Sequence, residues 1–167
     1  DLVMHTMIGG QVGIKVNDRV GHYFKTYKGL RQGDSMSPLL FDIATDALAI
    51  ILDKAKHAGY VRGVLTELGE SGVNMLQYAD DTIFVLNDDE NSAKNLKFIL
   101  TAFEQMSGLT INFHKSEVYL FGEAKNKGEI YQEIFTCNKG EVPFKYLGLP
   151  VTNVRLGNKF WKSMTEK

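Results

Sequence analysis

The sequence has only one cysteine and three prolines in 167 residues. The single cysteine, Cys137, excludes an intrachain disulfide and a four-cysteine zinc site. The longest apolar run, residues 47–52, is far too short to span a bilayer, and no basic-then-apolar leader stands at the start. The histidines also lack the spacing of metal ligands; they are His5, His22, His57 and His114. We therefore expect an intracellular globular protein with a real apolar core.

The chain also lacks a large charge of one sign, because its formal net charge is -1. Its basic residues are concentrated at the two ends. Residues 1–31 carry five Lys or Arg against two acids, and residues 139–167 carry six against two. Two basic flanks around an acidic centre suit a protein that holds phosphates near a metal. Charge counts this small also describe ordinary solvated faces.

The first half of the sequence predicts a hairpin followed by a long helix. Apolar residues alternate over 12–24 around the Asn17-Asp18 turn signal, in the manner of strands. Ser37 and Pro38 form a good helix start, and Gly59 a plausible stop. Apolar residues recur between them at helical spacing, so we expect this helix to be largely buried.

The second half mixes strands and helices without strict alternation. Residues 60–66 and 73–86 read as strands, the second interrupted at Ala79-Asp80-Asp81, which contains a turn-forming pair. An amphipathic helix fits residues 91–106, with Gly108 as its cap and an apolar stripe made of Leu96, Ile99, Leu100, Phe103 and Met106. Short strands near 110–113 and 117–121, a helix near 124–135 and a strand-like segment at 144–151 follow. The predicted class is α+β, in one domain over residues 1–167.

Asp80 and Asp81 are the residues that point most directly to chemistry. They lie between two apolar runs, so we expect dry surroundings in which two adjacent carboxylates repel unless a cation neutralises them. A hard divalent cation takes oxygen ligands and keeps positions for water and phosphate. Taken alone, however, an Asp-Asp pair at a hairpin tip is more often simple turn chemistry.

Four blocks, in order, resemble the reverse transcriptase family. Tyr78-Ala79-Asp80-Asp81 resembles its Tyr-x-Asp-Asp motif, and residues 29–41 resemble its Arg-Gln-Gly-Asp-Pro-Leu-Ser-Pro block. Residues 103–116 are similar to its Ser-Gly-Leu-x-Ile-Asn-x-x-Lys-Ser segment, and residues 146–148 to the block that follows. The last two are closest to non-LTR, LINE-type retrotransposons, particularly plant ones. The resemblance implies a palm-type antiparallel sheet packed on helices.

The resemblance also implies roles for single residues. Asp80 and Asp81 would bind Mg²⁺, with Mn²⁺ as the alternative, and Lys115 would protonate or steady the pyrophosphate leaving group. The residues implied in contact with nucleotide, template or primer are Arg31, Gln32, Gly33, Tyr78, Tyr146, Leu147 and Gly148. Arg31 and Lys115 are about as well explained as ordinary surface cations, and Asp34 is better explained by local backbone hydrogen bonds.

Two departures from the family pattern bear on activity. Ser35-Met36 replaces a Pro-Leu pair, which removes a rigid φ from the loop. Nothing in residues 1–28 matches the family's upstream aromatic-Asp strand, which would supply another metal-binding acid. We therefore expect an incomplete palm with part of the fingers, lacking the thumb and endonuclease, that is inactive alone and needs the missing segments.

The function implied by the resemblance is RNA-directed DNA polymerisation. A primer 3′-hydroxyl would attack a deoxynucleotide opposite a template base. The partners would be an RNA template, a DNA primer and a dNTP, with no membrane, and the family implies a place in the nucleus or cytoplasm. The alternative is a non-catalytic retrotransposon remnant that keeps the fold and binds nucleic acid. A group II intron maturase or telomerase relative is a third, weaker interpretation.

Overall fold

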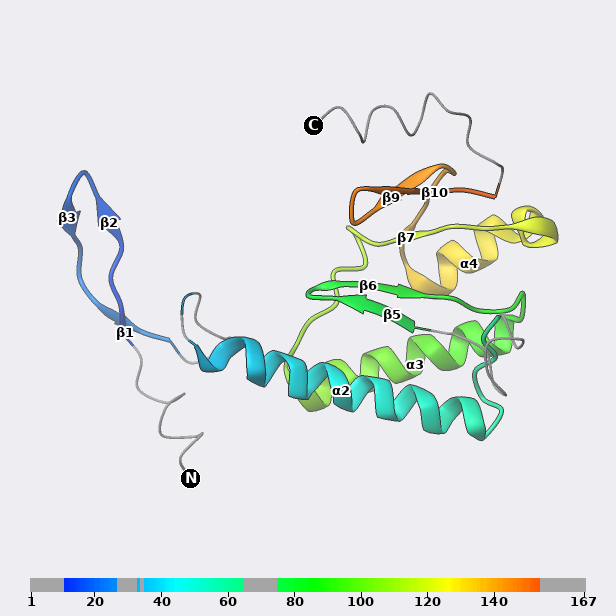
Figure 1. Cartoon of the computed structure of the whole chain (residues 1–167), viewed down its shortest axis with the longest axis horizontal. Coiled ribbons are helices and arrows are strands. Elements are labelled where there is room, and N and C mark those ends of the chain that lie inside the picture. Colours follow the sequence, from blue (N-terminus) through cyan, green and yellow to red (C-terminus); the bar gives the residue numbers. More distant parts are fainter. Residues whose placement is uncertain (1–10, 27–32, 34, 65–74, 154–167) are drawn as a thin grey trace. The chain divides into compact units, whose positions relative to one another are not determined.

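The computed structural model describes residues 11–26, 33, 35–64 and 75–153 (Figure 1). The chain divides into two compact units, residues 1–50 and 51–167, which are described separately. Helices and short strands are mixed, and the strands of the described part pair two by two, mostly antiparallel. The α+β class is therefore confirmed. A palm arrangement and a single domain stay predictions.

The first unit begins with the predicted hairpin. β1 (Gln11–Val12) pairs with β4 (Phe24–Lys25), and β2 (Lys15–Val16) pairs with β3 (Arg19–Val20). Asn17 and Asp18 form the turn with φ of 47° and 61°, a region that these two residue types tolerate better than most. No side chain of residues 11–26 is buried.

α2 runs over Met36–His57, so the predicted start at Ser37-Pro38 is confirmed to within one residue. Its end is also confirmed, because Gly59 has φ of 75° and the Tyr60 amide donates to the Ala55 carbonyl. The prediction that this helix is largely buried is wrong. Several apolar side chains are exposed because only one stripe of the helix is covered; the buried residues are Ser37, Leu48, Leu52 and Ala55.

The predicted strand at 60–66 is wrong for residues 60–63, whereas Val64 forms a single β-bridge. The backbone of Arg62 bonds instead to residues at and just before the start of the next helix. The Arg62 amide donates to Ser92 Oγ at 3.2 Å, and the Arg62 carbonyl accepts from the Asn87 amide at 3.0 Å. Val61 is buried at this crossing. The remainder of that predicted strand lies outside the described residues.

The predicted strand at 73–86 is a hairpin, with its first two residues outside the described part. β5 (Met75–Tyr78) and β6 (Asp81–Phe84) pair antiparallel. α3 (Glu90–Ser107) follows and ends at Gly108, as predicted. Its buried side chains are Ser92, Ala93, Leu96, Leu100 and Phe103. Met106 does not continue the stripe, because it is 72% exposed in the last turn.

The rest of the second unit packs against α3. β7 (Glu117–Val118) pairs in parallel with β8 (Asn138–Lys139), and η2 (Gly122–Lys127) leads into α4 (Gly128–Phe135). A core cluster joins α3 to this part and contains Ala93, Leu120, Ala124 and Tyr131. The predicted helix near 124–135 is thus confirmed, whereas the strand at 110–113 is wrong because that segment folds into turns.

The chain then forms a last hairpin from β9 (Phe144–Tyr146) and β10 (Leu149–Val151). The strand-like segment at 144–151 is therefore two strands with a turn between them. None of the described helices combines the length and apolar character needed to cross a bilayer.

Candidate active site

The β5–β6 hairpin presents the acid pair at its tip. Tyr78 pairs with Asp81, so Ala79 and Asp80 alone form the turn. Ala79 has φ of 50°, and its carbonyl accepts a hydrogen bond from Gln77 Nε2 at 3.4 Å. Asp80 is therefore the second residue of this two-residue turn, and Asp81 is the first residue of β6.

The two carboxylates are exposed, which corrects the prediction of dry surroundings. The apolar residues beside them belong to β5 and β6, where several are partly buried. The tip of the hairpin, residues 78–81, is exposed. Among the described residues, no Lys, Arg or His forms an ion pair with Asp80 or Asp81. Nor, in the same part of the chain, does a third His, Cys, Asp or Glu join them in a group able to hold a metal. The pair therefore offers two free sets of oxygen donors.

Lys115 lies in a compact turn after α3. Its amide donates to both the carbonyl and Oδ1 of Asn112, each at 3.1 Å. Ser116 caps the same Asn112 carbonyl through its amide and hydroxyl. The Lys115 side chain is exposed, so its ammonium is accessible to solvent and to a charged ligand.

Two residues of α3 hold this segment, and sequence reasoning missed both. Glu104 Oε1 accepts the Ile111 amide at 2.5 Å, and the Lys97 ammonium lies 3.1 Å from the centroid of the Phe113 ring. Lys97 also donates to the Phe135 carbonyl at 3.2 Å. Burial lowers the pKa of Lys97, and the charge of Glu104 opposes that shift. Lys97 and Glu104 are seven residues apart and so lie on one face of α3, two turns from each other, which was the available signal.

An open hollow of about 630 Å³ lies between α3 and this segment. Its lining is Lys97, Thr110, Ile111, Asn112, Phe113, His114 and Thr136. Lys115 is absent from the lining. The hollow is therefore beside the turn that carries Lys115 rather than under its side chain.

The β9–β10 hairpin brings Tyr146, Leu147 and Gly148 together. Leu147 and Gly148 form its turn with φ of 51° and 81°, and Tyr146 pairs with Leu149. The preceding Phe144 ring stacks on the Tyr119 ring, with centroids 3.9 Å apart. These three residues therefore lie together at a hairpin turn, while the contact with a primer that the resemblance implies stays a prediction.

Tyr119 is fixed from its other end as well. Its hydroxyl donates to Glu117 Oε2. Burial, and then this hydrogen bond, raise the pKa of Tyr119 to about 12. The ring therefore stays neutral near pH 7 and serves as a support for Phe144.

Arg31, Gln32 and Asp34 lie outside the described residues. Gly33 is described, and its φ of 84° is a conformation that side chains rarely adopt. An added Cβ there would meet no atom within 4 Å, so backbone conformation rather than space requires glycine. Gly33 belongs to the first unit and the acid pair to the second. Their predicted meeting at one site stays a prediction.

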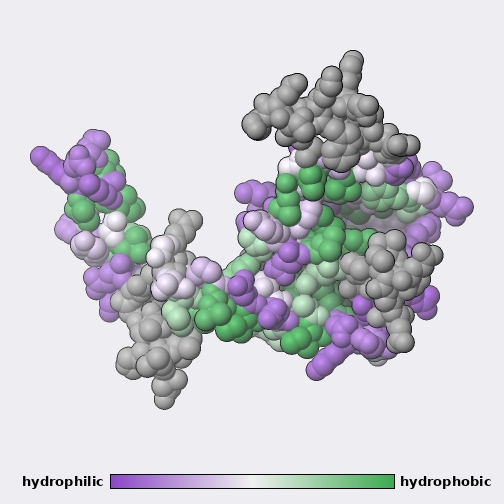
Figure 2. Space-filling model, in the orientation of Figure 1, coloured by the Kyte–Doolittle hydropathy of each residue, from purple (hydrophilic) through white to green (hydrophobic). Residues whose placement is uncertain are grey.

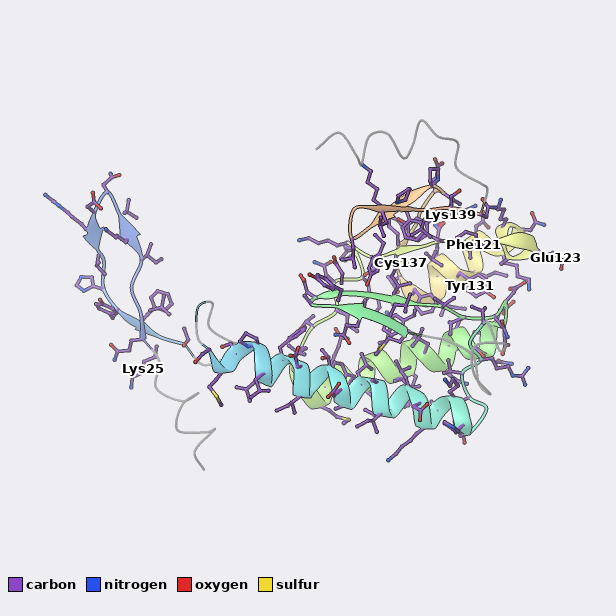
Figure 3. All side chains as sticks on the ribbon, in the orientation of Figure 1. Lys25, Phe121, Glu123, Tyr131, Cys137 and Lys139 are labelled. Carbon is purple, nitrogen blue, oxygen red and sulfur yellow. The ribbon has the colours of Figure 1, made fainter. Side chains whose placement is uncertain are left out.

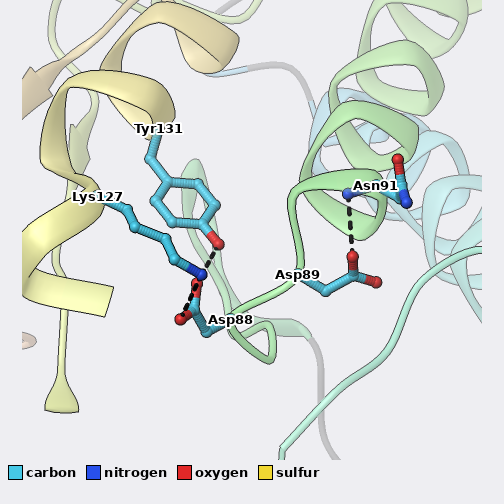
Figure 4. A network of polar contacts seen from close by, with 5 residues as sticks. All are labelled: Asp88, Asp89, Asn91, Lys127 and Tyr131. Atoms are coloured by element: carbon cyan, nitrogen blue, oxygen red, sulfur yellow. Dashed lines mark hydrogen bonds and ion pairs between the residues drawn. The ribbon is translucent and has the colours of Figure 1, made fainter. Parts of the chain in front are cut away.

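A second Asp-Asp pair, Asp88-Asp89, has a structural role that the sequence did not reveal (Figure 4). Asp88 accepts hydrogen bonds from the Tyr131 hydroxyl at 2.6 Å and from the Lys127 ammonium at 2.9 Å. Asp89 caps α3 by accepting from the Asn91 amide at 3.1 Å. It also accepts from Ser92 Oγ at 2.8 Å. These hydrogen bonds, that from Tyr131 first for Asp88 and that from Ser92 first for Asp89, lower the pKa of both carboxyls.

The two acid pairs therefore differ sharply. Each carboxylate oxygen of Asp88 and Asp89 accepts a hydrogen bond from a donor of this chain, while Asp80 and Asp81 are exposed to solvent. A family model described as reverse transcriptase (RNA-dependent DNA polymerase) matches residues 2–151. The chain belongs to the reverse transcriptase family. Residues 78–81, which resemble the Tyr-x-Asp-Asp motif of this family, lie within the matched range.

Two relatives are similar to this chain, and one of them is a retrotransposon protein. The retrovirus-related Pol polyprotein from the type-2 retrotransposable element R2DM of Drosophila melanogaster is 26% identical over 164 residues, or 91% of this chain and 14% of that protein. An uncharacterized mitochondrial protein of Arabidopsis thaliana is 38% identical over 55 residues, 33% of this chain and 45% of its own length. The chain thus spans less than half of either relative. The predicted resemblance to the reverse transcriptases of LINE-type retrotransposons is confirmed, while a partial domain stays a prediction.

Proposed function

We propose that this chain carries the metal-binding hairpin of an RNA-directed DNA polymerase of a non-LTR retrotransposon, built as part of a palm. The observation that supports this most directly is the Asp80-Asp81 pair, exposed at a two-residue turn within the family match. In the longer protein the substrates are an RNA template, a DNA primer and a dNTP, at work in the nucleus or cytoplasm.

Asp80 and Asp81 fit the ligands of Mg²⁺ or Mn²⁺. Both are hard oxygen donors, they are adjacent, and no ion pair with a described basic residue competes for them. Bound there, a divalent cation supplies charge stabilisation for phosphoryl transfer. Two carboxylates leave further coordination positions to water, to phosphate oxygens and to an acid from elsewhere in the polymerase.

The remaining residues position or neutralise the substrates. Lys115 holds a proton on its ammonium that can be given to a departing pyrophosphate, or steadies its charge. The turn at Leu147-Gly148 supports the primer end, and Tyr78 flanks the acids on β5. Arg31, Gln32 and Gly33 contact the nucleotide and template. Catalysis of this kind consists mostly of positioning and electrostatics. Because residues 1–28 lack a match to the family's upstream metal-binding acid, the isolated 167-residue chain has little polymerase activity.

Manganese binding tests the role of the acid pair without needing turnover. Free Mn²⁺ is titrated against the full chain by electron paramagnetic resonance. We expect binding that is lost in Asp80→Asn and in Asp81→Asn but kept in Asp46→Asn, a matched change at another exposed aspartate. Binding that survives both substitutions at the hairpin tip would refute the assignment.

A non-catalytic nucleic-acid-binding module is the second candidate. The described residues hold no third acid beside Asp80 and Asp81, which favours this reading over turnover by the isolated chain. It predicts salt-sensitive binding of nucleic acid without primer extension. A magnesium-dependent extension signal from the purified chain, lost in Asp80→Asn, would exclude it.

A further inference from the structure

The hairpin of residues 11–25 contains one extra residue on its returning strand. Val12 pairs with Phe24 and Lys15 pairs with Val20. Gly13 and Ile14 on the outgoing strand therefore lie opposite the three residues 21–23, which is the pattern of a β-bulge. A bulge is a common device for redirecting a side chain.

The redirected side chain is that of Tyr23. A Cβ added to Gly13 would lie 2.8 Å from Val20 Cγ1 and 3.1 Å from Tyr23 Cε1. The Val20 side chain and the Tyr23 ring therefore lie over Gly13, on one face of the hairpin. The absence of a side chain at Gly13 leaves the room that the ring occupies, while 66% of Tyr23 remains exposed.

The pairing assigns the other side chains to faces, since cross-strand partners share a face and neighbours alternate. Lys15 pairs with Val20 and so lies on the face of Tyr23. Lys25 pairs with Gln11, two residues before Gly13, and lies on that face too. The basic face is Gln11, Lys15, Val20, Tyr23 and Lys25. The opposite face, called the apolar face, is Val12, Ile14, Val16, Arg19 and Phe24.

Both faces are exposed, and Figure 2 shows hydrophobic and hydrophilic residues side by side along this hairpin. Lys25 is labelled near its base in Figure 3. Residues 11–25 hold three Lys or Arg and one acid, Asp18, which forms an ion pair with Lys15 at 2.8 Å. The pair is highly exposed, and such pairs contribute little, so Lys15 can exchange it for another anion.

We propose that the basic face binds single-stranded nucleic acid, with the Tyr23 ring stacking on a base and with Lys15 and Lys25 contacting phosphates. An exposed ring accepts any base, and flanking cations follow the backbone. Two residues separate each lysine position from the level of Tyr23, roughly 7 Å along the strands. That the strand is the template or primer of a polymerase rests on the proposed function; the binding itself does not.

Matched substitutions on opposite faces test the proposal. Binding of a fluorescein-labelled 20-nucleotide DNA strand to the full chain is measured by anisotropy, in EDTA and at several salt concentrations. We expect Tyr23→Leu to weaken binding about tenfold. Phe24→Leu, the same kind of change on the apolar face, should leave it within twofold. Circular dichroism checks that both variants fold.

The charge pair of the test is Lys25→Gln against Arg19→Gln. Loss of one phosphate contact lowers the salt slope of log K by about 0.7 for a single strand, and we expect this for Lys25→Gln alone. Equal effects from the two faces, or no effect from either, would overturn the proposal. So would tighter binding of a duplex than of the single strand, since a stacked duplex hides its base faces. Omitting metal separates these outcomes from failure of the Asp80-Asp81 assignment.

Discussion

At the scale of single residues, the chain uses one kind of side chain in two ways. Asp88 is surrounded by donors from Lys127 and Tyr131, while Asp80 meets none from the described residues. The difference comes from the partner elements and not from the dipeptide. A carboxylate whose hydrogen bonds are satisfied stabilises the fold, and one left free is available to a ligand.

The first prediction concerns pH. The hydrogen bonds to Asp88 lower its pKa in the folded protein below the value of about 3.9 expected for unfolded chains. Its contribution to stability is therefore complete above that unfolded value and is lost as the pH falls through the folded pKa. Tyr131→Phe removes the largest cause of the shift. We expect urea unfolding to show a smaller loss of stability between pH 5 and about pH 2.5 in this variant than in the wild type.

The second prediction concerns the cap of α3. Asp89→Ala removes the acceptor for the Asn91 amide and for Ser92 Oγ. Loss of an N-cap costs about 1 kcal/mol, which should appear as a lower midpoint of denaturation. Asp89→Asn keeps an acceptor and should recover most of the loss. An alanine variant as stable as the wild type would contradict the assigned role.

At the scale of elements, burial separates the two faces of α3. Leu96 is 2% exposed, whereas Phe98, two residues later, is 74% exposed. The two side chains project from different sides of one helix. The helix therefore contributes to the core through one stripe only.

A third prediction follows from this contrast. Leu96→Ala leaves a cavity between α3 and its neighbours and should destabilise the protein by about 2–4 kcal/mol. Phe98→Ala removes a larger side chain but should change the free energy of unfolding by less than about 1 kcal/mol, because little of it leaves water on folding. Chemical denaturation measures both. Equal losses would contradict the burial pattern.

The β9–β10 turn gives a fourth prediction. Gly148 has φ of 81°, and an added Cβ would meet no atom within 4 Å. Gly148→Ala should therefore cost about 1–2 kcal/mol through backbone conformation alone. Gly13→Ala tests the opposite case, since there an added Cβ meets Val20 and Tyr23. Amide chemical shifts should change at residue 23 in Gly13→Ala and stay local to the turn in Gly148→Ala.

At the scale of the whole molecule, buried side chains are distributed unevenly between the two units. The second unit contains a core cluster with Ala93 and Tyr131, while no side chain of residues 11–26 is buried. A two-stranded hairpin without a buried face is only marginally stable in water. Opening of the hairpin should therefore cost much less than opening of α3.

The fifth prediction is a pattern of hydrogen exchange. Amides near Leu96 and Leu100 should exchange slowest, and those of residues 15–20 fastest among the paired strands. Saturating single-stranded DNA should slow exchange in residues 15–25 and leave α3 unchanged. Protection that is equal in the two units would contradict this distribution.

The sequence by itself determined the local elements with strong chemical signals. Asn17-Asp18 and Asp80 lie in turns, and Gly59 and Gly108 end helices, because these residues carry their conformational preferences with them. The ordered family blocks also predicted the reverse transcriptase family before any geometry was known. The predicted roles of Asp80, Asp81 and Lys115 stay to be tested by experiment.

Only the tertiary structure decided which side chains lose contact with water. Residues 60–63 have strand composition, yet the Arg62 backbone bonds to residues at the start of α3. α2 has an apolar sequence, yet only one stripe of it is buried. Asp80 is exposed, whereas Asp88 accepts hydrogen bonds from Lys127 and Tyr131. This difference could not be predicted from the sequence, because both residues stand in an Asp-Asp dipeptide. Burial depends on partners distant in sequence, and a local pattern carries no information about where those partners lie.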